Sequence, residues 1–434
     1  MAPGEIIIQV LRGLLGLAAI VGIAWLLSSK RGAIDWRLVL AGLGLQIALA
    51  ALTLVVPGVA DAFDWVAGKV VQVLNLSFKG TDILFLGMAE PAKQHATLVI
   101  TIFATIVFVS SLTALLYYFR VLSWLVYGMA WVMRRVMRLS GPECLSAAAN
   151  VFVGQTEAPL LVKPYLKNMT RSELMALMTG GMATIAGSVL LVYVTVVGGA
   201  DLEAQKRIAK LLLSASLMSA PASLVMAKIF IPETAGTQKE LLLPRQNFGF
   251  NAFDAATSGA SDGLKLALNV ITMIVAFYAL IYLGNAILSW FGNMTGLNGL
   301  VAAWSGGVYA SLSIQAIASV LFAPLGFLIG VDLKDVFAVG ELIGTKIFFT
   351  DFIAFQSFAG MNEAGALSPK TAFVTTFALC GFANFVSIGV QLGGITALEP
   401  SQRENITSLG LKAMTAGVLA SLMTASVAGM FFAG

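Results

Sequence analysis

The chain has 434 residues, of which 58% are hydrophobic and 11% are charged, with a formal net charge of +4. Soluble domains carry about 25% charged residues, so this chain lacks the polar surface that a globule in water needs. The composition therefore excludes a set of soluble domains and predicts a polytopic membrane protein. Two cysteines and one histidine, His95, exclude a disulfide framework and multi-histidine metal sites.

Stretches of about 20 mostly apolar residues are expected to cross a membrane as helices. Eight such spans are predicted, at 6–27, 38–57, 97–119, 175–197, 211–231, 264–290, 371–393 and 409–432. The segment 59–79 is amphipathic and carries four charged residues, so we expect it to lie at the membrane interface. The segment 311–331 is apolar with polar residues on one side, and the sequence leaves open whether it spans the membrane or lies along it.

The placement of lysine and arginine predicts the orientation. When the loop with Lys30, Arg31 and Arg37 is put in the cytoplasm, most other clusters of basic residues fall on the same side. Both termini then face the outer, periplasmic side. This arrangement requires that 142–168 enters and leaves the membrane from inside and that 332–367 does so from outside.

The segment 142–168 is too apolar for a loop and too interrupted for a span, so we predict a re-entrant hairpin of two half-helices. Gly154 allows a tight reversal at the tip. Thr156 is the expected N-cap of the second half-helix, Glu157 suits its first turn, and Pro159 fits near its start.

The segment 332–367 repeats this pattern, with Thr350 and Asp351 as the cap and the first-turn acid. Each hairpin is followed by a helix with polar residues in mid-span. Two similar units that enter from opposite faces form an inverted repeat, and this layout is typical of secondary transporters with a site between the repeats.

A carboxylate at membrane depth costs about 2.5–3.5 kcal/mol or more, so Glu157 and Asp351 are functional candidates. Small polar residues such as Thr184 and Ser387 more often serve helix packing. Asn150 suits a hydrogen bond between helices and a ligand role equally well.

The predicted fold is an all-α membrane protein with about eight transmembrane helices, two opposed hairpins, and scaffold and transport domains. In chain order it divides into N-terminal scaffold spans (1–58), an interfacial helix and third span (59–140), the first repeat (141–231), a linker with a scaffold span and an interfacial or transmembrane helix (232–331), and the second repeat (332–434).

Four motifs in order resemble those of the concentrative nucleoside transporter family. They are GQTEAPLLVKPYL at 154–166, TGGMATIAGSVL at 179–190, MSAPASL at 218–224 and CGFANFVSIGV at 380–390. The resemblance runs from about residue 59 to the C terminus. It implies a homotrimer in a bacterial inner membrane that imports nucleosides by symport with Na⁺, or with H⁺ in some members, through an elevator-like movement.

The resemblance also implies roles for individual residues. The nucleobase would face Gln155, Thr156, Glu157 and Val189. The ribose would face Asp351, Asn384 and Ser387, and Phe382 would line the site. The sodium positions of the family correspond to Asn150, Val153, Thr184 and Ile185, which would use side-chain oxygens and carbonyls freed by unwound backbone.

The chain departs from the family at the second hairpin, where Thr350-Asp351-Phe352 replaces the usual Asn-Glu-Phe. Aspartate is shorter than glutamate by one C–C bond, about 1.5 Å. The substrate is therefore left open between a nucleoside and another polar neutral solute. Amides and carboxylates without an arginine at the hairpin tips suit a neutral substrate with donor and acceptor edges.

Three other functions remain to be compared with symport of a nucleoside. A channel predicts a continuous pore, and a membrane-embedded enzyme needs a nucleophile with a base or a metal cluster, for which one histidine is insufficient. A symporter of the same fold for another solute is the main alternative. The sequence does not distinguish Na⁺ from H⁺ coupling, or purine from pyrimidine preference.

Overall fold

A computed structural model describes residues 3–85, 98–236 and 250–432, and the described part is helical without β-strands. His95 lies outside the described residues. The helices are α1 (Pro3–Leu26), α2 (Trp36–Leu54), α3 (Val59–Phe85), α4 (Leu98–Tyr118), α5 (Val121–Met137), α6 (Gly141–Ala149), α7 (Ala158–Leu161), α8 (Lys163–Leu166), α9 (Arg171–Ala183), α10 (Gly187–Gly198), α11 (Leu202–Phe230), α12 (Ala252–Thr295), α13 (Leu297–Trp304), α14 (Ile314–Leu328), α15 (Val336–Phe348), α16 (Asp351–Glu363), α17 (Pro369–Leu379), α18 (Phe385–Leu398) and α19 (Arg403–Gly429).

The predicted spans coincide with helices. Within the described residues, seven segments are long and apolar enough to cross a membrane: α1, α2, α4, α9 with α10, α11, α12 and α19. The eighth predicted span, 371–393, falls on α17 and α18, which a non-helical segment separates. The structure thus bears out a multi-pass helical fold.

The two ambiguous segments are also helical. At 1.5 Å per residue, the 15 residues of α14 extend about 22 Å, which is short of a hydrocarbon core of about 30 Å. This length favours a helix that does not span the membrane by itself. Helix α3 is absent from the seven candidate spans among the described residues, and its interfacial position stays a prediction.

Helix α5 is a feature that the sequence analysis did not predict. It buries Leu122, Val126, Ala130 and Met133 along one face, at the spacing of an amphipathic helix. Its other face carries exposed side chains, among them Trp124. A search for apolar runs of about 20 residues misses this helix because it has only 17 residues and its last turn carries two arginines.

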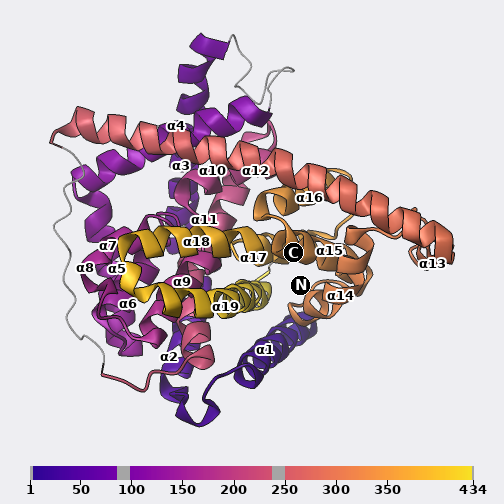
Figure 1. Cartoon of the computed structure of the whole chain (residues 1–434), viewed down its shortest axis with the longest axis horizontal. Helices are drawn as coiled ribbons and strands as arrows, with labels where there is room; N and C mark the ends of the chain where they lie inside the picture. The colour runs from indigo at the N-terminus through magenta and orange to yellow at the C-terminus, as the bar shows by residue number, and fades with distance from the viewer. Residues whose placement is uncertain (1–2, 86–97, 237–249, 433–434) are drawn as a thin grey trace.

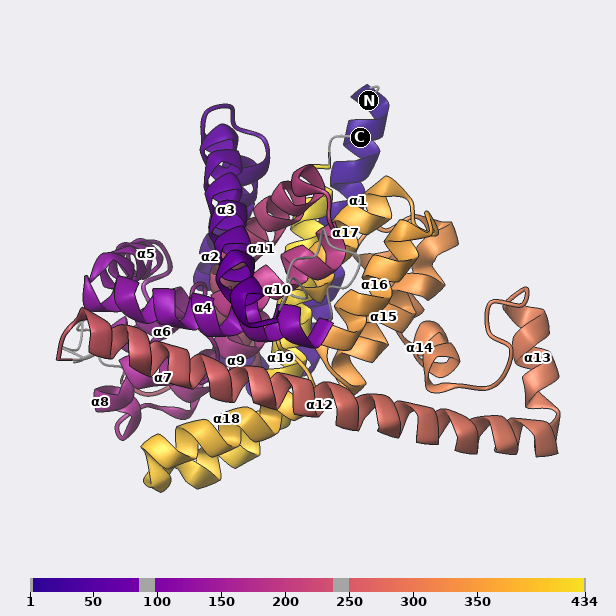
Figure 2. The ribbon, with the colours of Figure 1, turned by 90° about the horizontal axis from the view of Figure 1, so that it is seen from above.

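Helix α12 is longer than the predicted span at 264–290, with 44 residues. Figures 1 and 2 show it running across the whole molecule, beside α4. Gly259 and Gly263 make this close approach possible, since a Cβ on Gly263 would lie 2.9 Å from the Cα of Val107. In its most apolar stretch, only 11% of α12 is buried within the chain.

The same order of elements occurs twice. In the first unit, a hairpin of α6, α7 and α8 is followed by the broken helix α9–α10 and by the long helix α11. In the second, a hairpin of α15 and α16 is followed by the broken helix α17–α18 and by α19. Helices α11 and α19 pack against each other and against α9 at the centre of the molecule. The repeat predicted from the sequence is therefore present in the order of the helices.

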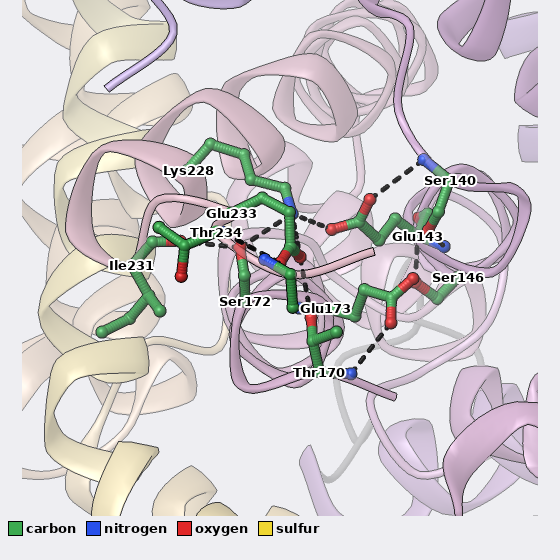
Figure 3. A network of polar contacts seen from close by, with 11 residues as sticks. Ser140, Glu143, Ser146, Thr170, Ser172, Glu173, Lys228, Ile231, Glu233 and Thr234 are labelled. Atoms are coloured by element: carbon green, nitrogen blue, oxygen red, sulfur yellow. Dashed lines mark hydrogen bonds and ion pairs between the residues drawn. The ribbon is translucent and has the colours of Figure 1, made fainter. Parts of the chain in front are cut away.

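Two capping boxes fix the base of the first hairpin (Figure 3). At the start of α6, Ser140 and Glu143 exchange hydrogen bonds between side chain and backbone, and Thr170 and Glu173 do the same at the start of α9. Each box satisfies free N–H groups of a helix start. Because all four residues are buried or nearly so, these starts are fixed inside the protein.

Lys228 of α11 connects these boxes (Figure 3). Its ammonium forms a buried ion pair with Glu143 and lies 3.7 Å from a carboxylate oxygen of Glu233. It also donates a hydrogen bond of 2.8 Å to the hydroxyl of Ser172. A buried charge needs such partners, so the base of the hairpin is anchored to α11 through one lysine.

Candidate functional site

The tip of the first hairpin is the non-helical segment between α6 and α7. The Glu157 carboxylate accepts a hydrogen bond of 3.2 Å from the backbone N–H of Gly154 and so closes the reversal. The predicted N-cap at Thr156 is wrong, because α7 begins at Ala158 and Glu157 occupies the capping position. The prediction overlooked that the longer side chain of Glu157 reaches back three residues.

The tip of the second hairpin lies between α15 and α16. The hydroxyl of Thr350 accepts a hydrogen bond from the N–H of Ile353 at 3.3 Å, and Asp351 is the first residue of α16. The predicted cap and first-turn acid are therefore confirmed. The Asp351 carboxylate accepts one hydrogen bond from the hydroxyl of Tyr193 and another, of 3.2 Å, from the amide of Asn384.

The two broken helices meet at their breaks. The backbone N–H of Phe382 donates to the carbonyl of Thr184 over 3.3 Å. Gly381, at φ +138°, comes so close that a Cβ would lie 2.9 Å from the carbonyl oxygen of Ala183. A residue with a side chain is strained in this conformation, so glycine permits the contact between the breaks.

Side-chain amides connect the first hairpin to α18. The amide of Gln155 donates to the hydroxyl of Ser387 at 3.0 Å, and the amide of Gln391 donates to the side-chain oxygen of Gln155 at 3.1 Å. Gln391 also reaches the carbonyl of Met178 at 3.0 Å. The hairpin tip of one repeat is thereby hydrogen-bonded to the broken helix of the other.

A cavity of about 560 Å³ opens between these elements. This volume lies in the range of small-molecule sites, about 300–1,000 Å³. It is lined by all eight residues that the sequence analysis proposed for substrate binding: Gln155, Thr156, Glu157, Val189, Asp351, Phe382, Asn384 and Ser387. The structure thus brings two separate sets of predicted residues together around one space.

Of the four residues proposed for the cation, Thr184 and Ile185 lie at the break of α9–α10, and Asn150 and Val153 lie in the segment between α6 and α7. Asn150 is fully buried, and both polar atoms of its amide lack a hydrogen-bond partner among the described residues. The hydroxyl of Thr184 donates to the carbonyl of Gly180 at 2.9 Å. Val153 and Ile185 lie in non-helical backbone. An unpartnered buried amide oxygen needs an explanation, and these oxygens fit a bound monovalent cation.

Family models cover most of the chain. The model described as "Na+ dependent nucleoside transporter C-terminus" matches residues 211–429, its N-terminal counterpart matches 15–88, and a "Nucleoside recognition" gate model matches 99–200. The chain belongs to the Na⁺-dependent nucleoside transporter family. This transporter is therefore not an enzyme, as expected from the sequence.

Relatives and solved structures agree with this assignment. The transporter is 40% identical to an uncharacterized transporter of Haemophilus influenzae over 98% of both chains. It is 37% identical to human solute carrier family 28 member 3, and the match covers 96% of this chain and 59% of that protein. A structure of CNTnw in an inward-facing, substrate-bound state superposes with a TM-score of 0.88 at 38% identity over 98% of both chains.

The sequence analysis missed several residues that line the transporter's cavity. Asp262, Lys265 and Asn269 form a polar face of α12, with an ion pair of 3.1 Å between the first two. Their helical spacing of three and four residues was a usable signal. Tyr193 also lines the cavity and stacks on Phe355 at 4.2 Å, but nothing in its apolar sequence neighbourhood indicates this position.

Proposed function

We propose that this transporter imports nucleosides by symport with Na⁺ through alternating access. The observation that carries the proposal is the cavity, which joins both hairpin tips and both broken helices. Such a site between two repeats can be opened to either side by moving one domain past the other. Among its described lining residues, the side chains at the hairpin tips are amides, hydroxyls and carboxylates, which suit a neutral polar solute.

The lining residues of the two repeats suit the two parts of a nucleoside. On the side of the first hairpin, Gln155, Thr156 and Glu157 offer donors and acceptors for the edge of a base, and Val189 offers an apolar contact. In the second repeat, Asp351 of α16 and Ser387 of α18 offer partners for ribose hydroxyls. A site that hydrogen-bonds a hydroxyl discriminates strongly against an analogue that lacks it.

Sodium would be held by the side-chain oxygens of Asn150 and Thr184 and by the carbonyls of Val153 and Ile185. Its positive charge would lie at the carbonyl end of α9, where the helix dipole is negative. A cation there would order the tip of the first hairpin, which carries Gln155. If Na⁺ tightens nucleoside binding in this way, the nucleoside tightens Na⁺ binding by the same factor.

The movement would separate a scaffold from a transport domain. The segments 141–231 and 332–434 would form most of the transport domain, while 1–58, 59–140 and 232–331 would contribute the scaffold. Helix α12 supports this division, because a long apolar helix that is little buried within its own chain requires lipid or other protomers around it. We propose a homotrimer in the inner membrane, with both termini on the periplasmic side.

One observation favours a second candidate, a symporter of the same fold for another polar solute or one coupled to H⁺. Both oxygens of Asp351 already accept hydrogen bonds within the protein, from Tyr193 and Asn384. A carboxylate with two internal donors offers fewer free acceptor positions to a ribose. A carboxylate in this setting is also a candidate for protonation during transport.

The test is uptake of labelled uridine and adenosine into proteoliposomes, with Na⁺ and pH gradients imposed separately. We expect accumulation with an inward Na⁺ gradient and none with the pH gradient alone. Accumulation that follows the pH gradient and ignores Na⁺ would establish the H⁺-coupled alternative. Failure of both nucleosides under both gradients would contradict nucleoside transport itself.

A further inference from the structure

A buried lysine occupies the second hairpin, close to the cavity but outside its lining. Lys346 lies in the last turn of α15 and is 2% exposed. Its ammonium donates a hydrogen bond of 2.9 Å to the carbonyl of Ala378, in the last turn of α17. Within the described part of the chain, no carboxylate lies within 4 Å of this ammonium, although Asp351 is near enough to interact with it electrostatically.

The environment of Lys346 differs from that of the other buried lysine. Lys228 has Glu143 as a direct ion-pair partner and Glu233 at 3.7 Å. Lys346 is instead stabilised by a carbonyl at the end of a helix, where the backbone dipole attracts positive charge. Burial of an ammonium without a paired carboxylate is costly, so the carbonyl of Ala378 is an essential partner of Lys346 at this place.

The first repeat has a corresponding place. Asn150 follows directly after α6, the first half-helix of its hairpin, just as Lys346 lies at the end of α15. The amide of Asn150 lies against Gly180, in the last turn of α9 before the break, just as Lys346 reaches the last turn of α17 before its break. In the first repeat, however, the amide oxygen has no partner among the described residues.

We infer that Lys346 is a tethered cation, which supplies in the second repeat the positive charge that bound Na⁺ supplies in the first. The inference rests on the proposed Na⁺ coupling and adds its stoichiometry. An ammonium and Na⁺ carry the same charge and are both attracted by carbonyl oxygens. Because Lys346 cannot dissociate, the second repeat contributes no coupling ion, and one Na⁺ binds per protomer with each nucleoside.

The first experiment counts bound sodium directly. The purified full-length transporter is dialysed to equilibrium against ²²Na⁺ with saturating uridine. We expect about one Na⁺ per protomer in the wild type, because one position is open and the other is filled by Lys346. In Asn150→Ala we expect clearly less bound Na⁺ at the same Na⁺ concentration, because the site loses one of its oxygen ligands. Two Na⁺ per protomer in the wild type would overturn the inference and would leave Na⁺-coupled nucleoside transport intact.

The second experiment replaces the tethered charge by a free one. Lys346→Ala leaves a space beside Ala378 for a small cation. We expect it to weaken uridine binding about tenfold, because Asp351, which lines the cavity, loses the positive charge with which it interacts. Methylammonium should restore the affinity in this variant. The matched control is Lys346→Met, which removes the charge but fills the space, so methylammonium should not restore its affinity.

The outcomes are separable. Equal uridine affinities of Lys346→Ala with and without methylammonium would contradict a tethered cation and would assign Lys346 a packing role. If Lys346→Ala does not fold, the sodium count of the wild type still decides the stoichiometry. If the wild type binds no Na⁺, the proposed sodium coupling and the sodium stoichiometry both fail, whereas the methylammonium rescue still decides whether Lys346 acts as a cation.

Discussion

The backbone N–H of Phe382 donates to the carbonyl of Thr184, so the breaks of two helices from different repeats are hydrogen-bonded to each other. Thr184 belongs to the proposed cation position, and Phe382 lines the cavity. A single hydrogen bond therefore connects the proposed cation position to a residue of the proposed substrate position. This proximity explains how binding of Na⁺ and binding of a nucleoside would be coupled.

The cation position yields the first prediction. Asn150→Ala removes a buried amide oxygen that has no other partner among the described residues, so we expect it to raise the Na⁺ concentration for half-maximal uridine uptake by about tenfold or more. The measurement is uptake into proteoliposomes over a Na⁺ series. Thr424→Ala, which removes a hydroxyl of α19 that contacts Gln46, is the control and should leave the Na⁺ dependence unchanged.

Glu157 yields the second prediction. Glu157→Gln keeps an oxygen that accepts the hydrogen bond from Gly154, so the hairpin tip should fold normally, but it removes the charge that faces the cavity. We expect uptake to fall by at least about tenfold, since a hydrogen bond to a charged group is worth about 1.5–3 kcal/mol. Glu363→Gln at the exposed end of α16 is the matched control. Near-normal uptake by Glu157→Gln would remove Glu157 from the substrate site.

Local patterns in the sequence predicted much of this architecture. Apolar runs located the spans, because a membrane helix must be apolar over its length. The pairs Thr156–Glu157 and Thr350–Asp351 located both hairpin tips, because a turn with a helix start has its own residue preferences. The predicted cap at Thr156 lies one residue before the observed capping position, because the side chain of Glu157 closes the tip by accepting a hydrogen bond from the N–H of Gly154.

Features that depend on tertiary contacts were not predictable in this way. Tyr193 and Lys346 stand in apolar stretches, and their roles follow from Asp351 and Ala378, which lie on other elements. The length of α12 was underestimated because its first turns combine exposed polar residues with glycines that pack on α4. Such residues become visible only when the neighbours across the fold are known.

The base of the first hairpin yields the third prediction. Lys228→Met would leave Glu143 buried without its cation, and breaking a buried pair in this way costs about 3–5 kcal/mol. We expect the melting temperature of the purified transporter to fall clearly. The double variant Lys228→Met with Glu143→Gln should regain much of the loss because it removes the uncompensated charge as well. If the double variant melts as low as the single one, packing and not charge explains the effect.

The fourth prediction concerns Asp351 and its hydrogen bond from Tyr193. If the Asp351 carboxylate reads ribose hydroxyls, uridine should inhibit uptake more strongly than 2′- or 3′-deoxyuridine, by about 10- to 150-fold for a loss of 1.5–3 kcal/mol. Asp351→Ala should abolish this difference, because the discriminating acceptor is gone. Tyr193→Phe removes one donor to the same carboxylate while keeping the stack on Phe355, so it should free an acceptor position and keep or increase the difference.

The measurement is competition of labelled uridine uptake by both deoxyuridine isomers. Identical ratios of inhibition constants in the wild type and in Asp351→Ala would show that Asp351 does not contact the ribose, and its charge would then be assigned to balancing Lys346.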